Sequence, residues 1–371
     1  MEKPLHIVFF ILNPFDYDSR AQLICHDILS SGWRLDIIAT IGGKIPSFGN
    51  ADIHRLPQPV WPTRKRRFIE YNIRATSLAK RLRADIYHAV DLDTLWAAVN
   101  AARTVGGKVV YESRELYTEL MSLSGRPIVR AFWSILEKKL IRKVDVVVTV
   151  NQAIAEEMTK RYRINPPEIV MNVARSGESI EPIDLRKEFN LQSKFVLIFQ
   201  GILRPGQGIL RAIELIVYLP EVSLVFIGDG PLRDTIEKRA NDLGISNRVR
   251  IAGKIEPGRL AHYTSGADAG LILIEPVALN NRLALPQKLF QYISAETPPI
   301  VSDLPMLRQI VQEDKLGLVL KDGLPKESAE AVRDFLNNGL EMAIGQCRIA
   351  KRKYCWEIEG KKFINLYRNL V

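Results

Sequence analysis

Residues 267–305 read ADAGLILIEPVALNNRLALPQKLFQYISAETPPIVSDLP and hold one complete folding pattern. The apolar run 269–274 has the length of a strand, and a polar loop follows it at 275–286. A helix pattern begins behind Pro286, which suits a first helical turn because its missing N–H is not needed there. Another apolar run begins at Ile300. Strand, loop, helix and strand in this order predict a parallel sheet with polar groups gathered at the carboxyl end of a strand.

The chain repeats this alternation on both sides of a polar segment. The apolar run 5–12 predicts a first strand buried on both faces; it is too short for a signal peptide and lacks a small-residue cleavage site. Residues 172–194 are polar and rich in turn residues, and a new apolar run begins at Phe195. Because 371 residues are many for one hydrophobic core, we expect two domains with a linker in 172–194.

The composition narrows the class of partner and compartment. The net charge of +10 suggests an anionic partner such as a nucleotide, a nucleic acid or an acidic membrane face, and a generally basic soluble protein remains an alternative. Cys25, Cys347 and Cys355 have no metal-binding spacing and are odd in number, which favours a reducing compartment. No apolar run reaches the roughly 18 residues that a membrane-spanning helix needs, so we expect none.

The stretch from Leu279 to Pro305 carries a family resemblance. It reads LNNRLALPQKLFQYISAETPPIVSDLP and resembles the donor-sugar segment of the family 4 retaining glycosyltransferases, whose pattern reads roughly LNNRxALPNKLFEYxAAGxPVVxSDLP. The resemblance covers nearly the whole chain. It implies an α/β protein of the GT-B fold, with two Rossmann-like, doubly wound parallel-sheet domains facing across a cleft. The implied parts are an acceptor domain at 1–180, a donor domain at 190–350 and a terminal helix at 351–371 that crosses back to the first domain.

The resemblance also implies an activity. A hexosyl or N-acetylhexosaminyl group would pass with retention from a nucleoside diphosphate sugar to a glycan or lipid-linked acceptor, in surface polysaccharide or glycoconjugate assembly. Enzymes of this fold generally stabilise the leaving nucleoside diphosphate with basic side chains and helix dipoles, so the resemblance implies no metal and no cofactor beyond the sugar nucleotide. It also implies a cytoplasmic protein. A sugar-nucleotide epimerase is a weaker alternative, because its carboxylate and histidine motifs are missing.

A glycine-rich loop follows the apolar strand 195–199. Its glycines let the backbone approach a ligand, and a helix N-terminus behind them favours phosphate, although such a loop alone is a weak signal. By resemblance this loop binds the donor diphosphate, and the Gly-Asp-Gly turn after the next strand lies near the nucleotide. The donor-binding residues that the resemblance implies are Gly201, Arg204, Gln207, Gly208, Gly228, Asp229, Gly230, Asn281, Arg282, Lys288 and Gln291.

Three short segments of the N-terminal half end in polar residues. The resemblance places Asp18, Ser19 and Arg20 on the acceptor side, although an ordinary helix-capping turn explains them equally well. It also implies catalytic positions at His88, Asp91 and Arg114. Arg114 stands where the family has a histidine; an arginine is always charged and cannot shuttle a proton, but it can contact a phosphate or an acidic acceptor.

Residues 61–83 form a basic stretch with interleaved aromatic residues. Such a stretch suits an anionic membrane surface, single-stranded nucleic acid or a solvated helix face. The resemblance favours the membrane, with Arg64–Arg67 and their neighbours at its inner face, and it favours no nucleic-acid partner.

Several family motif positions carry other residues in this chain. Gln291 stands where the family has the carboxylate that binds the nucleotide ribose, and Glu296 replaces a glycine, which matters if that position needs a positive φ. These changes keep open an impaired pseudo-glycosyltransferase that acts as a partner or scaffold subunit. The substituted positions are Val90, Arg114, Gln207, Gln287, Gln291 and Glu296.

Overall fold

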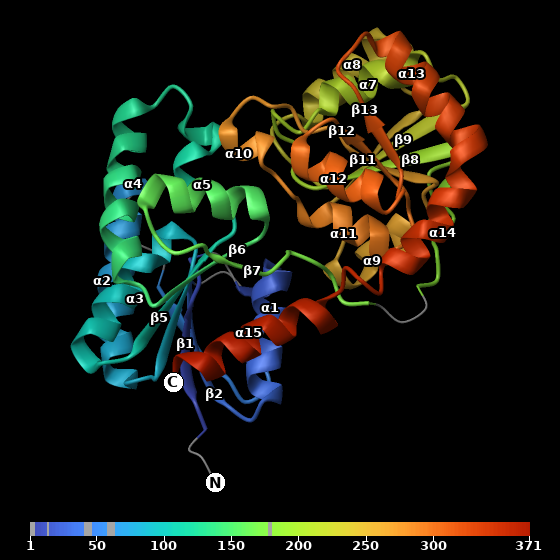
Figure 1. The fold of residues 1–371 in the computed structure, drawn as a ribbon. Helices are drawn as coiled ribbons and strands as arrows, with labels where there is room; N and C mark the ends of the chain where they lie inside the picture. Colours follow the sequence, from blue (N-terminus) through green and yellow to red (C-terminus); the bar gives the residue numbers. More distant parts are fainter. Residues whose placement is uncertain (1–3, 13–14, 41–46, 58–63, 177–179) are drawn as a thin grey trace. The chain divides into compact units, whose positions relative to one another are not determined.

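The computed structural model describes residues 4–12, 15–40, 47–57, 64–176 and 180–371. The chain forms two compact units (Figure 1). Unit 1 comprises Met1–Met171 together with Ile358–Val371, and unit 2 comprises Asn172–Glu357. The chain therefore leaves unit 1 once and returns to it with its last helix.

Within the described residues, unit 1 contains a seven-stranded sheet in the order β3-β2-β1-β4-β5-β6-β7, and all of its strand pairs are parallel. Its strands are β1 (His6–Phe10), β2 (Arg34–Thr40), β3 (Asp52–Leu56), β4 (Ile86–Val90), β5 (Lys108–Ser113), β6 (Val146–Thr149) and β7 (Glu168–Ile169). Its helices are α1 (Ser19–Ser30), α2 (Arg64–Leu82), α3 (Leu92–Val105), α4 (Pro127–Leu140), α5 (Gln152–Tyr162) and α15 (Trp356–Leu370), which begins just before the unit boundary.

The described part of unit 2 contains a six-stranded parallel sheet in the order β10-β9-β8-β11-β12-β13. Its strands are β8 (Phe195–Gln200), β9 (Val222–Ile227), β10 (Val249–Gly253), β11 (Ala269–Ile272), β12 (Pro299–Ser302) and β13 (Leu318–Leu320). Its helices are α6 (Leu185–Glu188), α7 (Ile209–Val217), α8 (Arg233–Asp242), α9 (Pro257–Ser265), α10 (Leu279–Arg282), α11 (Gln287–Ser294), α12 (Pro305–Glu313), α13 (Pro325–Asp334) and α14 (Leu340–Ala350).

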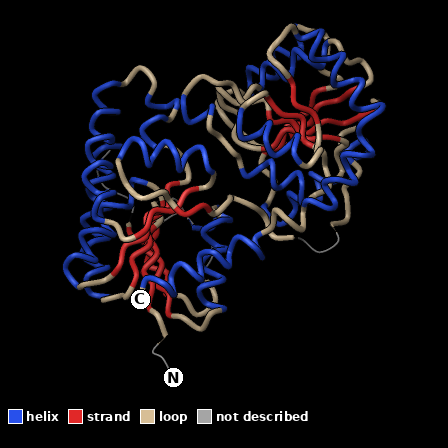
Figure 2. The backbone as a smooth tube through the Cα atoms, viewed as in Figure 1, coloured by secondary structure: helices blue, strands red, loops and turns tan. Residues whose placement is uncertain are grey.

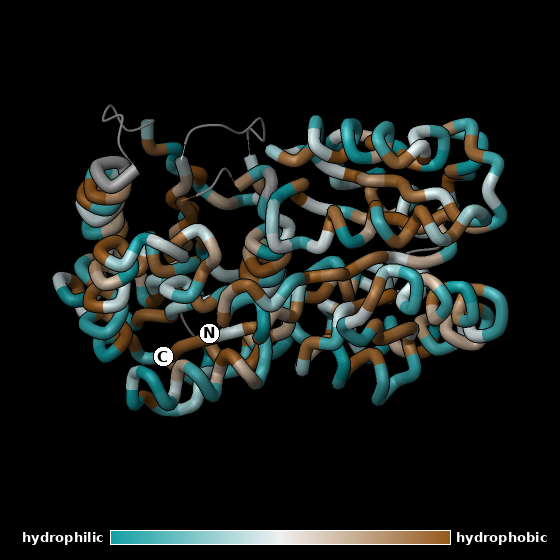
Figure 3. Tube along the Cα trace, turned by 90° about the horizontal axis from the view of Figure 1, so that it is seen from above, coloured by the Kyte–Doolittle hydropathy of each residue, from teal (hydrophilic) through white to brown (hydrophobic). Residues whose placement is uncertain are grey.

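The apolar patterns of the sequence explain these elements. The central strands β1 and β8 are buried along their whole length because helices cover both faces of each sheet (Figure 2). Helix α7 buries Ile209, Ile213 and Ile216, which lie on one face at helical spacing. In each unit, brown segments lie mostly in the interior and teal segments along much of the outside (Figure 3). The prediction of an α/β protein with two doubly wound parallel sheets is confirmed.

Some elements were not predicted. Strand β3 has no continuous apolar run, since its residues are mostly half-buried at the sheet edge. Helix α8 was also missed: it is strongly polar and buries only Ile236 and Ala240. The short helix α10 lies inside the segment 275–286, which was predicted to be a loop. Polar edge elements lack the periodic apolar signal on which sequence interpretation depends.

Candidate functional site

The strand order places most of the predicted site residues beside the points where the order of the strands in a sheet reverses. In unit 2 the chain runs outward from β8 in one direction and from β11 in the other, so β8 and β11 flank the point where the strand order reverses. In unit 1 the same point lies between β1 and β4. Ligands of open α/β sheets bind beyond the carboxyl ends of the strands at such switch points. The loops after these four strands carry most of the residues singled out in the sequence.

The glycine-rich loop of unit 2 needs glycine at Gly208. Its φ is +70°, and a Cβ there would lie 1.8 Å from the carbonyl oxygen of Leu273, which follows β11. The adjoining turn has the same requirement, because Gly228 has a φ of +133° and its Cβ would lie 1.9 Å from the carbonyl oxygen of Gly201. The missing side chains therefore let the loops after β8, β9 and β11 pack backbone against backbone.

Hydrogen bonds join this loop to the segment after β11. The N–H of Glu275 donates to the carbonyl oxygen of Gly206 at 3.1 Å, and Asn281 Nδ2 donates to the same oxygen at 3.4 Å. Lys288 Nζ donates to Gln207 Oε1 at 3.2 Å. The two predicted donor segments, far apart in the sequence, therefore form one cluster at the carboxyl edge of β8 and β11.

Lys288 is the most unusual charged residue of this cluster. Lys288 as a whole is only 9% exposed, and its Nζ lies 4.1 Å from the centre of the Phe199 ring. Among the described residues no carboxylate forms an ion pair with it; its charged neighbour is the cation of Arg204. Burial, with a smaller effect from Arg204, lowers the pKa of Lys288 to about 7. A buried ammonium beside a second cation indicates a place for an anion.

Two helices begin beside Lys288. Helix α7 starts after Gly208 and α11 starts after Pro286, and neither helix has a side-chain cap on its first turn. The uncapped N–H groups and the helix dipole favour negative charge at these ends. Together with the buried ammonium of Lys288, they form an environment suited to a diphosphate.

Gln291 is half-buried and ends a hydrogen-bonded chain that includes the buried side chains of Gln200 and Thr264. Gln200 Nε2 donates to Gln291 Oε1 at 2.5 Å, and Gln200 Oε1 accepts from the Thr264 hydroxyl at 2.9 Å. Gln200 and Thr264 were missed in the sequence analysis. The available signal was a polar residue at the end of the otherwise apolar strand β8. Gln291 thus lies beside the carboxyl end of β8, and its hydrogen bond with Gln200 helps to hold its amide in place.

The other predicted donor residues lie around the same edge. Arg204 is exposed, and its influence on the pKa of Lys288 places its cation near the ammonium. Arg282 is exposed on α10, with Nε donating to the carbonyl oxygen of Pro276 at 3.2 Å. Asp229 is exposed and accepts from the N–H of Gly230 at 2.8 Å, and its carbonyl accepts from Leu203 at 3.1 Å.

In unit 1, the structure brings Asp18, Asp91 and Arg114 together. Arg114 donates from Nη1 to Asp18 at 2.6 Å and from Nη2 to Asp91 at 2.8 Å, and its Nε also reaches Asp91 at 3.2 Å. These carboxylates raise the pKa of Arg114 further above its ordinary value. All three side chains keep a minor exposed part. Two carboxylates surround one guanidinium, so the cluster carries a net negative charge.

Asp91 has a strained backbone. Its φ of +58° and ψ of 169° lie in a region that glycine occupies far more readily than other residues. It precedes α3 without capping that helix, and its carboxylate is turned to Arg114 instead. Strain of this kind persists where the surroundings enforce it, and it gathers at functional positions.

Two of the predicted residues of unit 1 have buried side chains. His88 is completely buried in β4, and Arg20 is only 2% exposed on α1. Arg20 donates to Glu112 at 2.5 Å and to the carbonyl oxygens of Val170 and Met171 at 2.9 and 2.7 Å. Of the predicted segment, Asp18 faces the edge and caps α1 through Ala21, and Ser19 is exposed at its first position.

His88 belongs to a buried polar network. Its Nδ1 is 2.7 Å from the hydroxyl of Tyr367 on α15, and its Nε2 is 3.4 Å from Glu112. Burial lowers the pKa of His88, whereas the Arg20 cation and the His88 contact outweigh burial at Glu112 and hold the pKa of that carboxyl well below its usual range. This network ties the last helix to the sheet of unit 1, so the role of His88 in the structure is internal.

The backbone at Glu296 has a positive φ, the conformation that glycine adopts without strain. Its φ is +56°, and it follows α11 in a helix-ending turn in which Thr297 N–H donates to Tyr292 and Glu296 N–H donates to Ile293. The Glu296 carboxylate accepts from Arg348 at 2.9 Å and from Lys351 at 2.6 Å. These ion pairs with the segment around α14 compensate part of the strain that glycine would avoid.

The sequence-based membrane prediction falls largely outside the described side chains. Arg64–Arg67 begin α2, but their side chains lie outside the described residues. Across the part of the chain that the structure describes, no helix has both the length and the apolarity to cross a bilayer. The described residues also contain no cluster of three histidine, cysteine or acidic side chains able to hold a metal ion.

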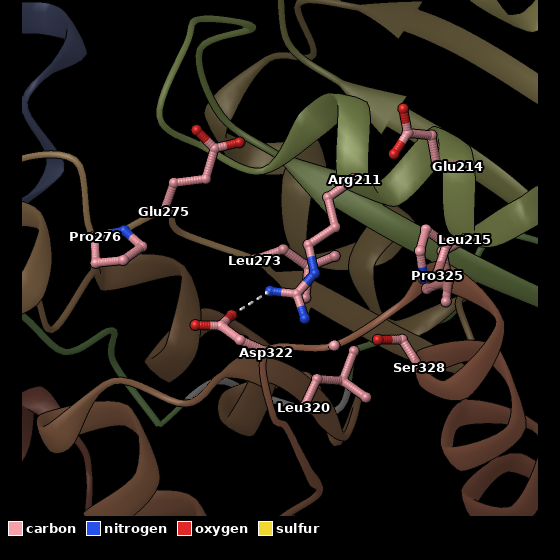
Figure 4. Close-up of a pocket in the computed structure, with 11 residues that line it drawn as sticks. Arg211, Glu214, Leu215, Leu273, Glu275, Pro276, Leu320, Asp322, Pro325 and Ser328 are labelled. Atoms are coloured by element: carbon pink, nitrogen blue, oxygen red, sulfur yellow. Dashed lines mark hydrogen bonds and ion pairs between the residues drawn. The ribbon is translucent and has the colours of Figure 1, made fainter.

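A cavity of about 350 Å³ lies elsewhere in unit 2, between α7, the segment after β11 and the start of α13 (Figure 4). Arg211 points toward Asp322 there and donates to its carboxylate at 3.3 Å. None of the predicted donor residues lines this cavity. It adjoins the donor cluster through Leu273 and Glu275, which belong to the segment that packs against the glycine-rich loop.

Curated proteins similar to this chain include several glycosyltransferases. MJ1607 of Methanocaldococcus jannaschii, an uncharacterised glycosyltransferase, is 24% identical over 249 residues, which is 60% of this chain and 59% of that protein. Alpha-D-kanosaminyltransferase of Streptomyces kanamyceticus is 22% identical over 250 residues, 63% of each chain. The lipopolysaccharide core biosynthesis glycosyltransferase LpsE of Rhizobium meliloti is 31% identical over 112 residues, 30% of this chain and 33% of that protein. The chain thus spans about six tenths of the length of the first two relatives.

Solved structures resemble the chain over its full length. Sucrose-phosphate synthase from Thermosynechococcus elongatus aligns with a TM-score of 0.82 at 16% identity, covering 99% of both chains. Anabaena HepE in complex with UDP and glucose aligns with a TM-score of 0.77 at 14% identity, covering 99% of this chain and all of that one. At these identities the likeness shows the fold.

Family models match both parts of the sequence. The model "Glycosyltransferase Family 4" matches residues 21–172, and the model "Glycosyl transferases group 1" matches residues 182–352. Together they cover most of each unit, and the described residues of each unit form one parallel sheet. The chain therefore belongs to the family 4, group 1 glycosyltransferases and has the GT-B fold.

Proposed function

We propose that this protein transfers a sugar from a nucleoside diphosphate sugar to a glycan or lipid-linked acceptor, with retention of the anomeric configuration. The expected role is in the assembly of surface polysaccharides or glycoconjugates. Family membership supports the reaction class, and the name of LpsE, a lipopolysaccharide core biosynthesis enzyme, supports the setting. The proposed catalytic and acceptor-side group is the cluster of Asp18, Asp91 and Arg114.

The observation that carries the proposal is the position of Lys288. Its ammonium is buried, lies over Phe199 and lies beside the N-terminal ends of α7 and α11. A bound diphosphate would supply the negative charge that the described surroundings of Lys288 lack. It would raise the pKa of Lys288 from about 7 and so hold the amine charged during the reaction. The same charge would stabilise the nucleoside diphosphate as it leaves.

The other proposed donor residues are assigned by their position relative to Lys288. Gly201 and Gly208 allow the loop to approach the phosphates, and Arg204 supplies a second cation near Lys288. Gln291 would accept one hydrogen bond from the nucleotide ribose. An amide in place of a carboxylate weakens such a contact by about 1–2 kcal/mol, roughly tenfold in affinity. We therefore expect binding that is weaker than a carboxylate would give at this position.

The negative cluster of unit 1 suggests the character of the acceptor. Arg114 donates to both Asp18 and Asp91, so most of its donors are occupied within the protein. A phosphate on the acceptor would meet two carboxylates at this point. We therefore propose that a neutral hydroxyl of the acceptor sugar lies here, and that any lipid phosphate lies elsewhere.

A panel of nucleoside diphosphates, without added metal, tests the donor site. UDP, GDP, dTDP and ADP are added separately to the full-length protein, and the midpoint of thermal unfolding is measured. A ligand that binds the native state at a hundredfold excess over its dissociation constant stabilises it by about 2.7 kcal/mol. We expect one nucleotide to raise the midpoint and Lys288→Ala to abolish that rise.

A matched variant controls for removal of a lysine from unit 2. Lys238 is exposed on α8, and Lys238→Ala should keep the full nucleotide response. If no nucleotide shifts the wild-type midpoint at millimolar concentration, the donor-site assignment is wrong. The anomeric configuration of the product, determined by NMR, tests retention separately.

A pseudo-glycosyltransferase remains the second candidate, and two contacts favour it. The side-chain oxygen of Gln207 accepts from Lys288, and that of Gln291 accepts from Gln200. Both amides stand at positions where the family uses charged side chains, and both are already bonded within the protein. Nucleotide binding without turnover of any sugar nucleotide, in the presence of varied glycan acceptors, would support this candidate against the enzyme.

A further inference from the structure

The cavity between α7, the segment after β11 and the start of α13 combines an apolar wall with polar side chains (Figure 4). The apolar wall includes Leu215, Leu273 and Leu320, which belong to the buried core of unit 2. The polar side chains come from α7 and from the segments after β11 and β13, and they are Arg211, Glu214, Glu275 and Asp322. Concave sites with an apolar lining and a few polar groups are typical of small-molecule binding.

The charges around the cavity largely cancel. Arg211 Nη1 donates to Asp322 at 3.3 Å, and Glu214 accepts from Arg239 at 3.2 Å. The third carboxylate, that of the half-buried Glu275, has no hydrogen bond or ion pair among the described residues. An anionic ligand would meet three carboxylates here, whereas only one of them lacks a cationic partner. The cavity therefore disfavours an anion and favours a ligand that carries little or no net charge.

The cavity offers both hydrogen-bond donors and acceptors. Arg211 uses one N–H for Asp322 and a second for the carbonyl oxygen of Lys321, at 2.9 Å. A guanidinium has five N–H groups, so Arg211 can donate further. The Glu275 carboxylate can only accept. Hydroxyl groups both donate and accept, so a ligand with several hydroxyls suits these two side chains.

A buried hydroxyl without a partner lies on the same side of the sheet. Ser302 ends β12 and is only 3% exposed, and its Oγ has no hydrogen-bond partner among the described residues. Because side chains alternate along a strand, Ser302 lies on the same face as Ile300, which belongs to the core that α7 and α13 cover. The register partner of Ser302 in β13 is Leu320, which lines the cavity. Buried polar groups nearly always have a partner, and a ligand hydroxyl at this end of the cavity would supply one.

We propose that this cavity binds a neutral sugar of about the size of a monosaccharide. Its volume of about 350 Å³ lies near the lower end of the range of roughly 300–1,000 Å³ that small-molecule sites occupy. The sugar hydroxyls bond to Glu275, Arg211 and Ser302, and the C–H groups of the ring pack against the leucines. The chemistry of the lining selects this class, because it combines paired charges, donors, acceptors and an apolar wall.

The proposal goes beyond the transfer reaction and uses other residues. Lys288 does not line the cavity, and neither do the other predicted donor residues. A failure to bind nucleotide would therefore leave the sugar site standing. A failure to bind sugar in the cavity would likewise leave the transferase proposal standing.

Saturation-transfer NMR on the full-length protein, without nucleotide, tests the proposal. The methyl glycosides of glucose, galactose and mannose are titrated separately, and a dissociation constant is obtained for each. We expect at least one of them to bind in a saturable manner. The amino form and the phosphate form of that sugar are then compared with it. The phosphate form should bind more weakly, because its charge faces the carboxylates.

Two variants locate the bound sugar in the cavity. Glu275→Gln should weaken binding by roughly tenfold, because a charge-assisted hydrogen bond becomes a neutral one. Glu313→Gln, an exposed residue of α12, makes the same change elsewhere in unit 2 and should bind like the wild type. Ser302→Ala should also weaken binding, yet it should leave the thermal midpoint of the sugar-free protein nearly unchanged, because its hydroxyl has no partner to lose.

The same titrations can overturn the proposal in four ways. Saturable binding of none of the three glycosides would do so. An amino form that binds at least about tenfold more tightly than the neutral sugar would show a site for a cation instead. Unchanged affinity in both Glu275→Gln and Ser302→Ala would place the sugar elsewhere. Loss of binding in Lys288→Ala, together with normal binding in Glu275→Gln, would place it in the donor cluster.

Discussion

At the residue scale, burial decides the charge of Lys288. The ordinary pKa of a lysine is 10.5, and burial lowers that of Lys288 to about 7 in the folded protein. Between these two values the unfolded chain holds a proton that the folded chain lacks. The free energy of unfolding therefore gains a contribution that rises with pH from about 7 to 10.5. Below pH 7, Lys288 is charged in both states and its burial destabilises the fold.

The same residue predicts a pH dependence of nucleotide binding. A diphosphate beside Lys288 raises its pKa, so binding above pH 7 takes up a proton, and affinity falls by up to about tenfold per pH unit. Isothermal titration at pH 8, in buffers of different ionisation enthalpy, should report this uptake. Lys288→Met should remove it, and Lys238→Ala should keep it. Equal proton uptake by wild type and Lys288→Met would show that another group titrates.

Glu296 gives a second prediction at this scale. Both Glu296→Gly and Glu296→Ala remove the ion pairs with Arg348 and Lys351, but only glycine relieves the positive φ of +56°. A left-handed conformation costs about 1–2 kcal/mol for a residue with a Cβ. Glu296→Gly should therefore be more stable than Glu296→Ala by about 1 kcal/mol in denaturant unfolding. An alanine variant as stable as the glycine variant would contradict the strain that we assign to this position.

At the scale of single elements, α15 shows how a terminal helix is fixed to a sheet. Tyr367 reaches His88, and Glu359 accepts from the N–H of Met171 at 2.8 Å, just where the chain leaves unit 1. Arg20 holds the carbonyl oxygens of Val170 and Met171 from the other side. Polar contacts thus fix both the exit of the chain from unit 1 and its return.

Removal of the Tyr367 hydroxyl tests this attachment. Tyr367→Phe leaves Nδ1 of the buried His88 without its partner on α15, and a buried group left unsatisfied costs about 1–3 kcal/mol. We expect a loss of this size in the free energy of unfolding. Tyr218 is substantially exposed, and Tyr218→Phe should change stability little. Equal effects of the two substitutions would argue against a specific role of the Tyr367–His88 contact.

At the scale of the whole molecule, the candidate donor site lies within unit 2. The residues around Lys288 come from the loops after β8, β9 and β11, and all belong to Asn172–Glu357. Each unit has its own sheet and its own covering helices. Nucleotide binding should therefore protect the backbone N–H groups of unit 2 more than those of unit 1.

Hydrogen exchange of the backbone N–H groups, measured with and without the nucleotide, shows which unit the nucleotide protects. We expect the strongest added protection at residues 201–208 and in the first turn of α11, because the N–H groups there would bond to phosphate. Lys288→Ala should lose this protection under the same conditions. Protection that is strongest in the strands of unit 1 would place the nucleotide elsewhere.

The fold and the loops that carry the candidate donor residues could be predicted from local patterns. Continuous apolar runs mark strands that helices cover on both faces, and Gly208 and Pro286 mark where helices begin. Their order along the chain implies parallel sheets. Strand β3 and helix α8 escaped prediction because their apolar signal is weak at the edge of a sheet and on a polar helix.

The direction of individual side chains was not predictable in this way. Asp18 and Arg20 are two residues apart, yet Asp18 faces the sheet edge toward Arg114 and Arg20 points into the core. Arg20 is held by Glu112, which is 92 residues away, and His88 by Tyr367, which is 279 residues away. No local pattern carries the information that these partners meet.

The sequence by itself determined the family, through the motif from Leu279 to Pro305 and the matches to family models. It also determined the two parallel sheets and the loops that carry the candidate donor residues, because these depend on short-range spacing of apolar residues, glycine and proline. Only the tertiary structure decided that His88 is buried, that Arg114 is held between Asp18 and Asp91, and that Lys288 is buried beside a second cation. The physical reason is that burial and charge depend on neighbours brought together from distant parts of the chain, and these neighbours exist only after the sheets have formed.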